Sequence, residues 1–459
     1  MSVRLLGWLE RLLSGYWFLP ALMALGALAL SGATLALDRT ITLERAPGFL
    51  VLGGLNGPAG ARALLSTVAG SLITVTGVVF SMTLVGLSLA SQQFGPRLVG
   101  NFMRDRGNQL VLGAFVGTFL YCLMVLRTVR SADAQLGNQA FVPHLSVAVA
   151  MALTLLSLGV LIYFIHHAAE SVQVSYVLAR VGHGLTKQIQ SFPKGDEPDD
   201  DGNRSGAGEA DAGEEGGLPS PRPGLPEDFG REAITVRAAR AGYVQAIDLA
   251  GLVNLAREHD AVLRLHHPPG SFLMLDGPLA DIYPPDAGDA LSGRIDTFYV
   301  LGAVRTPQQD PYFLFDQLLE VALRALSPSM NDPFTAMTCI DRMAEALNLL
   351  ARRRLPDPYT TDEDGVLRLV VPRPEIGELL EHLFGELRTN AAGDPMVARH
   401  LALTLRRMQA SSSHEDLRRT ADLEVRRLLE SAVTRQSASD YEALSRASRK
   451  VTAWIRLED

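Results

Sequence analysis

The sequence predicts a membrane α-helical protein with four transmembrane helices, followed by a cytoplasmic α+β region with a small β-barrel-like piece and a helical bundle. Four uncharged apolar stretches occupy the first third of the 459 residues. Charged residues make up only 20% of the chain and the mean hydropathy is +0.13, whereas soluble domains carry about 25% charged residues. A longer region with an acidic segment and mixed polar and apolar patterns follows.

The four apolar stretches are residues 17–37, 64–90, 110–126 and 145–165. Each reaches or approaches the ~20 residues that a helix needs to cross ~30 Å of hydrocarbon. A cleaved signal peptide is the alternative for the first stretch, but its apolar run exceeds the usual ~7–15 residues and three more spans follow. We therefore expect a transmembrane domain at 1–190.

The charges around the spans indicate the orientation only weakly. An even number of spans puts both termini on one side, and six arginines fall on that side against five on the other (Arg4, Arg11, Arg97, Arg104, Arg106 and Arg180 against Arg39, Arg45, Arg62, Arg127 and Arg130). The long C-terminal region has an acidic linker and no disulfide pattern, which is typical of a cytoplasmic domain. We expect a multi-pass protein of the bacterial inner (plasma) membrane with both termini in the cytoplasm.

The second apolar stretch carries a regular row of hydroxyl side chains. Thr67, Thr74, Ser81 and Ser88 recur every seven residues, which is two helical turns, so they share one face. Two interpretations remain open. Small residues allow close helix packing, whereas in a symmetric homo-oligomer the same hydroxyls would form rings that line a pore for small ions.

Ionisable residues are absent from the middle of every span, although a proton-driven pump normally needs one. This weakens the case for a secondary transporter and leaves passive conduction open.

Polar residues cluster where the second and fourth spans leave the membrane on the same side. Gln93 and Arg97 follow the second span, and His166, His167 and Glu170 end the fourth. His166 and Glu170 are spaced i, i+4 and can face each other. Two candidate ligands are too few for a metal site, so we expect these residues to couple the spans to the C-terminal region at the inner interface.

Composition divides the rest of the chain into three parts. Residues 191–232 are rich in Gly, Pro, Asp and Glu, which predicts a disordered acidic linker. Residues 233–311 predict a small mixed α/β or barrel-like domain, in which 261–265 and 271–275 form a strand pair around a Pro-Pro-Gly turn. Residues 312–459 predict a helical cytoplasmic domain. His266 and His267 near that turn are expected to be structural.

The dipeptide Asp-Pro recurs at positions 310, 332 and 394. An Asp at a helix start accepts bonds from free backbone N–H groups, and Pro at the first helical position lacks the N–H that would go unused. The repetition predicts that Asp332 is a helix cap. The alternative is a site formed between two helix ends, with residues Ser327, Arg305, Gln309, Asp310, Asn331 and Asp332.

Several function classes lack support in the sequence. The linker holds the whole net charge of −8, and the rest of the chain is balanced, so no nucleic-acid partner is expected. Nucleotide-binding, hydrolase and zincin fingerprints do not occur. We expect no cofactor, no metal and no catalytic residue, which favours a protein that is not an enzyme.

Four segments together resemble a known family. They are SQQFGPRL, HHAAESVQ, GYVQAID and ALSPSMNDPFTA, which begin at residues 91, 166, 242 and 325. The chain is similar over most of 1–430, without the linker, to a large family of bacterial predicted membrane proteins described only as a domain of unknown function. The resemblance implies four spans and a soluble C-terminal region, and it supplies no activity. Where the family reads Ser-Pro before the Arg, this chain has Gly95-Pro96, which argues against a serine role there.

The leading hypothesis is an oligomeric ion pore or channel, lined by the second span and regulated by the cytoplasmic domain. The first alternative is a non-conducting membrane scaffold that docks a cytoplasmic partner. The second is a membrane-bound enzyme with a site near Arg305, Asp310 and Asn331.

Overall fold

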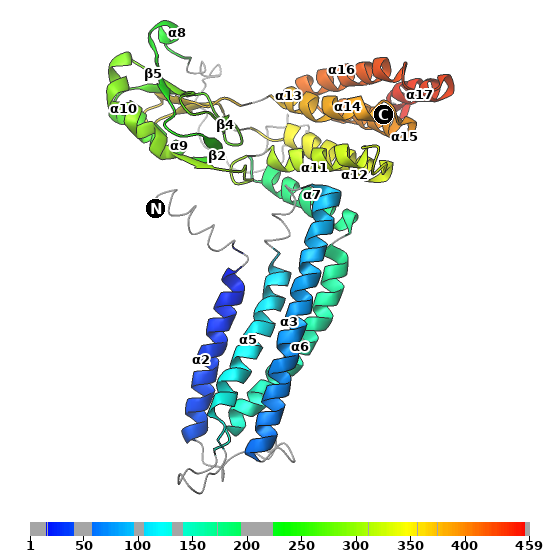
Figure 1. Ribbon diagram of the computed structural model, residues 1–459. Coiled ribbons are helices and arrows are strands. Elements are labelled where there is room, and N and C mark those ends of the chain that lie inside the picture. The colour runs from blue at the N-terminus through cyan, green and yellow to red at the C-terminus, as the bar shows by residue number, and fades with distance from the viewer. Residues whose placement is uncertain are drawn as a thin grey trace, which may run out of the picture. The chain divides into compact units, whose positions relative to one another are not determined.

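A computed structural model describes Gly15 and residues 17–40, 57–95, 105–130, 141–171, 173–193, 224–310, 312–355, 357–373 and 375–454. The chain forms two compact units, which we call the N-terminal unit (Met1–Val177) and the C-terminal unit (Leu178–Asp459). Figure 1 shows the elements of each. Most of the predicted linker, residues 194–223, lies outside the described residues, and its last residues form the short helix α8 (Phe229–Glu232).

The N-terminal unit contains the four predicted spans as long apolar helices. They are α2 (Phe18–Thr40), α3 (Pro58–Phe94), α5 (Arg106–Thr128) and α6 (His144–Ser171), and all are long and apolar enough to cross a membrane. The 37 residues of α3 correspond to about 55 Å of helix, so α3 is longer than a bilayer core is thick. Pro58 at its first turn and Gly95, with φ +97°, mark its ends.

The central helix of this unit is α5. More than half of its apolar window is buried, 56% against 17–22% for the other three helices. It packs against α2, α3 and α6 through buried side chains such as Phe115, Tyr121 and Val125, which meet Leu65 and Leu72 of α3. The described part of the N-terminal unit is therefore a closely packed helical bundle.

The described part of the C-terminal unit contains two sheets. Five strands follow the order β1 (Ile234–Arg237), β5 (Pro278–Tyr283), β3 (Val262–Leu265), β8 (Leu367–Val370) and β7 (Tyr359–Thr361), and only the β3–β8 pair is parallel. The second sheet is antiparallel. Its three strands follow the order β4 (Phe272–Leu273), β2 (Gly242–Ile247) and β6 (Tyr299–Gly302).

The expected mixed α/β character of this region is confirmed, but the barrel-like alternative and one expected strand pair are not. Both sheets keep open edges, and among the described residues no closed barrel is found. The expected strand pair around the Pro-Pro-Gly turn does not form either, because β3 pairs with β5 and β8 while β4 pairs with β2. Helices α9 (Leu249–Glu258) and α10 (Gly288–Ile295) share the apolar core with the strands through Leu252, Leu263 and Leu291.

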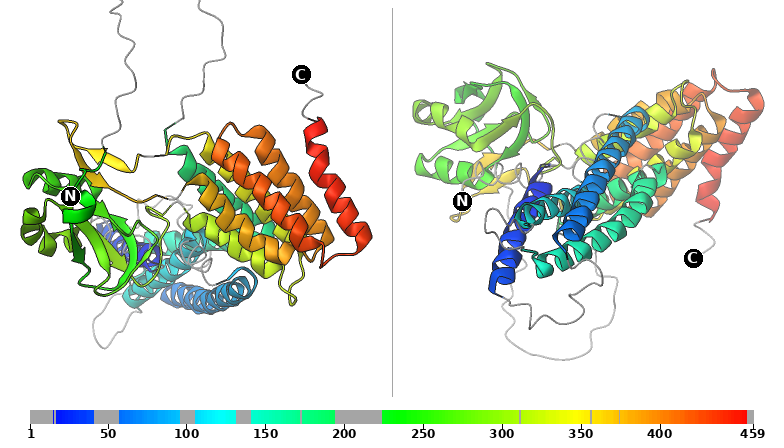
Figure 2. Two further views of the ribbon diagram at one scale, coloured as in Figure 1. Left: turned by 90° about the horizontal axis from the view of Figure 1, so that it is seen from above. Right: turned by 60° about the horizontal axis from the view of Figure 1, so that its bottom comes forward.

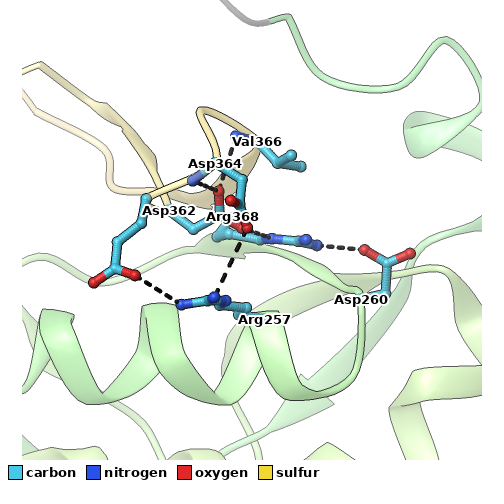
Figure 3. Close-up of polar contacts among 7 residues, drawn as sticks. Arg257, Asp260, Asp362, Asp364, Val366 and Arg368 are labelled. Carbon is cyan, nitrogen blue, oxygen red and sulfur yellow. Dashed lines mark hydrogen bonds and ion pairs between the residues drawn. The ribbon is translucent and has the colours of Figure 1, made fainter.

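The hairpin β7–β8 comes from the segment predicted to be helical, and ion pairs fasten it to α9 and to the turn after α9 (Figure 3). Arg368 on β8 donates to Asp362 of the hairpin and to Asp260 after α9, both at 2.7 Å. Arg257 on α9 reaches Glu363 in the hairpin turn at 3.2 Å. The five-stranded sheet therefore contains strands from both sides of residue 311.

The remaining helices of the C-terminal unit lie side by side (Figure 2). They are α11 (Phe313–Ala325), α12 (Pro333–Ala351), α13 (Ile376–Leu380), the π-helical turn η5 (Glu381–Gly385), α14 (Glu386–Ala391), α15 (Pro395–Ser411), α16 (Glu415–Ala432) and α17 (Ala438–Trp454). Helix α7 (Val174–Gln190), which follows α6 directly, packs against α11 and α12 at Gly184 and Gly182.

Candidate functional site

The hydroxyl row of α3 lies on the exposed side of that helix. Thr67, Thr74, Ser81 and Ser88 are all exposed. The residues that α3 buries are Leu65, Ala69, Leu72 and Val79, at 0–8% exposure, together with Ala61, Thr76 and Ala90. At about 100° per residue this buried set points roughly opposite to the hydroxyl row. The row is therefore not part of the packing among the described helices of the chain.

The same face is shallow. A Cβ added to Gly70 or Gly77 would meet no atom within 4 Å. Ser71 and Thr74 donate back to the carbonyls of Thr67 and Gly70 at 2.8 and 2.9 Å, as hydroxyls on an otherwise unpartnered helix surface do. The face thus carries small side chains and carbonyl-bonded hydroxyls, together with the exposed Val78 and Val85 on the same side of the helix.

Hydroxyls on the other spans are used inside the bundle. Thr34 of α2 bonds Tyr121 of α5 at 2.8 Å, and Thr118 of α5 bonds Ser157 of α6 at 3.1 Å. Apart from Thr40 at the last residue of α2, the exposed Ser and Thr residues of the described spans all belong to α3 (Ser66, Thr67, Ser71, Thr74, Ser81 and Ser88). Large apolar side chains are exposed on α3 (Val78 and Val85 among others) as they are on α2 and α6. The exposed hydroxyls are therefore what distinguishes α3 from those two helices.

At the end of the bundle where α5 begins and α6 ends, the structure pairs two residues that the sequence did not link. His167 of α6 lies 3.2 Å from Asp105, and Asp105 also caps α5 by accepting from Gly107 at 2.8 Å. His166 and Glu170 form the expected i, i+4 pair at 3.2 Å on the surface. The side chain of Gln93 and the whole of Arg97 lie outside the described residues, so their predicted contacts stay predictions.

Asp105 was not identified as a site residue from the sequence. Its signal is an Asp directly before an apolar helical run, which is the pattern of an N-cap.

In the C-terminal unit, Arg305 and Asp310 do come together. Two guanidinium nitrogens of Arg305 lie 2.7 and 2.8 Å from Asp310 Oδ2, and a third bonds Asp316 of α11 at 2.5 Å. Asp310 is 1% exposed. His382 on η5 reaches the other oxygen of Asp316 at 2.9 Å. These four residues, which we call the Arg305 network, join the segment after β6 to the helical part of the unit.

The contacts within the Arg305 network shift the pKa values of its members. Burial disfavours the charge on Asp316, but the bonds from His382 and Arg305 outweigh it and hold the pKa of that carboxyl below its usual range. The bond to Asp316 raises the pKa of His382, against a smaller opposite effect of burial. At Asp310, by contrast, burial outweighs the bonds from Arg305 and raises the pKa of the carboxyl. Coupled charges of this kind occur in structural networks as well as in catalytic sites.

The other members of the expected cytoplasmic site lie elsewhere. The side chain of Gln309 bonds both backbone groups of Ile247, at 2.9 and 3.3 Å, and so joins the segment after β6 to the end of strand β2. Asp332 accepts from the N–H and hydroxyl of Thr335, at 3.1 and 2.6 Å, and caps α12 as predicted. Asn331, with φ +45°, precedes it.

Helix α11 separates these two groups. Asp310 lies before its start and Asn331 follows its end, and its 13 residues span about 20 Å. The set does not converge on one catalytic centre.

One of the two histidines near the Pro-Pro-Gly turn also has structural neighbours. His266 lies 3.0 Å from Asp281, which also binds Arg264 and Thr235. Within the described part of the chain, no group of three or more His, Cys, Asp or Glu residues is placed to hold a metal ion.

Comparison with known proteins assigns this chain to a family. The model of a family described as predicted membrane protein (DUF2254) matches residues 14–407. Uncharacterized proteins of Mycobacterium tuberculosis (strain H37Rv) and Mycobacterium bovis are each 32% identical over 348 residues. The match covers 74% of this chain and 62% of each relative, so the chain spans less than two thirds of their length. No solved structure matches.

Proposed function

We propose a function for this chain, which belongs to the DUF2254 family of predicted membrane proteins. Several copies assemble in the bacterial inner membrane into an ion pore that is lined by the hydroxyl face of α3. The C-terminal unit is its cytoplasmic regulatory region. The observation that carries this proposal is the position of the hydroxyls, because the exposed Ser and Thr of the described spans, except Thr40, gather on one face of one helix.

A single copy does not supply a water path along this face. Helix α5 fills the centre of the described bundle, and the row Thr67, Thr74, Ser81 and Ser88 points away from it. Small residues let helices of neighbouring copies approach closely, and hydroxyl rings around a common axis replace part of the hydration shell of a passing ion. The pore therefore requires a homo-oligomer.

Ion flux through purified protein in liposomes tests the proposal. We expect flux with the unmodified protein and none with Thr74→Leu/Ser81→Leu, because leucine would replace the polar lining with apolar bulk. The matched control is Ala152→Leu/Gly159→Leu, which adds leucines to exposed positions of α6 and should leave flux unchanged. Equal flux in both variants would refute the assignment of the lining to α3.

The non-conducting scaffold makes a different prediction for the same face. Cysteines introduced at positions 74 and 81 would react with a water-soluble thiol reagent if they line a pore, and would be protected if copies close tightly around them. The native Cys122 and Cys339 are both fully buried, so the introduced thiols would give the signal. Protection at both positions, together with no flux, would favour the scaffold.

The enzyme hypothesis has no comparable support, because α11 separates Arg305 and Asp310 from Asn331.

A further inference from the structure

Helix α7 is tied to the membrane surface by the chain itself. Helix α6 ends at Ser171 and α7 begins at Val174, so at most ~10 Å of backbone separates the two helices. The end of α6 carries His166, Glu170 and the exposed Tyr163, a composition typical of the boundary between hydrocarbon and water. Wherever the C-terminal unit lies, the first turns of α7 stay close to the lipid headgroups.

The two faces of α7 differ sharply. One face is apolar and buried (Val177, Leu178, Val181, Leu185 and Ile189). Its contacts within the C-terminal unit include Gly184 against Leu314 of α11 and Gly182 against the Arg342 stem of α12. The apolar face is therefore already covered by protein and is not free to enter the bilayer.

The opposite face carries an aromatic residue and three basic residues. Tyr176, Arg180, His183 and Lys187 are exposed, and their i, i+4, i+7 and i+11 spacing puts them in one row. Helix α7 contains no Asp or Glu. We call this row the basic stripe.

The end of α12 extends this positive charge. Arg353 and Arg354 bond the backbone of Phe192 and Pro193, just after α7, at 3.3 and 3.0 Å. Arg352 and Arg354 are exposed there.

We propose that the basic stripe of α7 binds anionic phospholipid headgroups of the membrane that α6 enters. Guanidinium and ammonium groups attract phosphate, and tyrosine is enriched at headgroup level. Since α11 and α12 cover the apolar face, the contact is with the headgroups and does not involve insertion. The inference is independent of whether α3 lines a pore.

A fluorophore on Gln190→Cys tests this contact in the full-length protein. Gln190 is exposed beside the basic stripe, whereas both native cysteines are fully buried. The protein is reconstituted into phosphatidylcholine vesicles, with or without phosphatidylglycerol, that contain the same fraction of a lipid with a nitroxide on its headgroup. We expect strong quenching in the anionic vesicles, weak quenching in the neutral ones, and loss of the difference at high salt.

Charge removal provides the second arm. Each basic residue near an anionic surface raises binding about fivefold, so Arg180→Gln/Lys187→Gln should lower the ratio of bound to unbound helix about 25-fold. Arg419→Gln/Arg426→Gln removes the same charge from the exposed side of α16, where the two side chains are 81% and 70% exposed, and should leave quenching unchanged.

Three results would overturn the proposal. They are equal quenching in neutral and anionic vesicles, unchanged quenching in the α7 variant, and an equal loss in the α16 control. Energy transfer between labels on different copies without lipid quenching would show that the stripe faces a second copy instead.

Discussion

The carboxylate of Asp38, near the end of α2, accepts hydrogen bonds from both the backbone N–H and the hydroxyl of Ser146, at 2.9 and 2.6 Å, in the first turn of α6. It also accepts from Leu145 N–H at 2.8 Å. Asp38 thus caps a helix more than a hundred residues away in the chain. The carbonyl of Ser146 in turn accepts from Tyr121 at 3.2 Å, so a polar chain ties α2, α5 and α6 together at one end of the bundle.

Replacing Asp38 with alanine should lower the stability of the helical bundle. Loss of a capping carboxylate costs about 1 kcal/mol, and the N–H groups of Leu145 and Ser146 would lose their acceptor. The thermal unfolding midpoint of the detergent-solubilised protein, followed by circular dichroism, measures the effect. Arg39→Ala, at an exposed neighbouring position, should leave the midpoint unchanged. An unchanged midpoint for Asp38→Ala would show that the cap contributes nothing.

Substitution of Gly270 should destabilise the C-terminal unit. Its φ of +95° is unfavourable for other residues, and an added Cβ would lie 2.3 Å from Asp310 Oδ2. Asp310 is held by Arg305 and cannot move aside freely, so Gly270→Ala should cost about 1–3 kcal/mol. Gly293→Ala on α10 meets open space and should be neutral or stabilising. Urea unfolding of both variants compares them, and equal stability would contradict the argument.

The role of Asp332 can be separated from catalysis by two substitutions. Asn is as good a cap as Asp, whereas Ala is not. Asp332→Asn should therefore keep the stability of the unmodified protein, and Asp332→Ala should lose about 1 kcal/mol in the same unfolding measurement. A large loss with Asn would mean that the charge itself, rather than the cap, is needed at the start of α12.

Local signals in the sequence predicted the four apolar helices and two of the three Asp-Pro caps correctly. The third is wrong, because α11 begins at Phe313 after Tyr312 and has no side-chain cap. The apolar stretches became α2, α3, α5 and α6 because a helix that satisfies its own backbone is one of few structures that hydrocarbon tolerates. Asp332 and Asp394 cap α12 and α15 because the Asp-Pro pattern acts within one helical turn. The outward position of the α3 hydroxyl row was not predicted, since periodicity shows which residues share a face but not what that face meets.

Contacts between distant segments were the part that the sequence did not reveal. The parallel pair β3–β8 joins Leu263 to Leu369, and two short strands separated by several helices carry no local signal of their pairing. His167 meets Asp105 in the same non-local way. The barrel-like alternative was expected from a short loop pattern alone, which carries no information on the pairing of β8, from the predicted helical segment, with β3.

The Arg305 network predicts a specific pH dependence of stability. Because Asp316 raises the pKa of His382 in the folded state, the pair stabilises the fold fully below the ordinary histidine pKa of ~6.5. That contribution is lost as the pH rises through the higher folded pKa. The lowered pKa of Asp316 matters at acidic pH. The stability that this carboxylate contributes is complete above the ordinary Asp pKa of ~3.9 and is lost as the pH falls through the lower folded pKa.

His382→Gln should therefore flatten the decline in the unfolding free energy of the C-terminal unit between about pH 6 and pH 8. Glutamine keeps a hydrogen-bond donor for Asp316 but cannot titrate. The variant therefore tests the effect of the histidine charge without removing the hydrogen bond. His183→Gln, at an exposed position of α7, should keep the slope of the unmodified protein when both are measured in detergent. If His382→Gln shows the same decline as the unmodified protein, the pH dependence arises from other groups and the His382–Asp316 pair does not contribute to it.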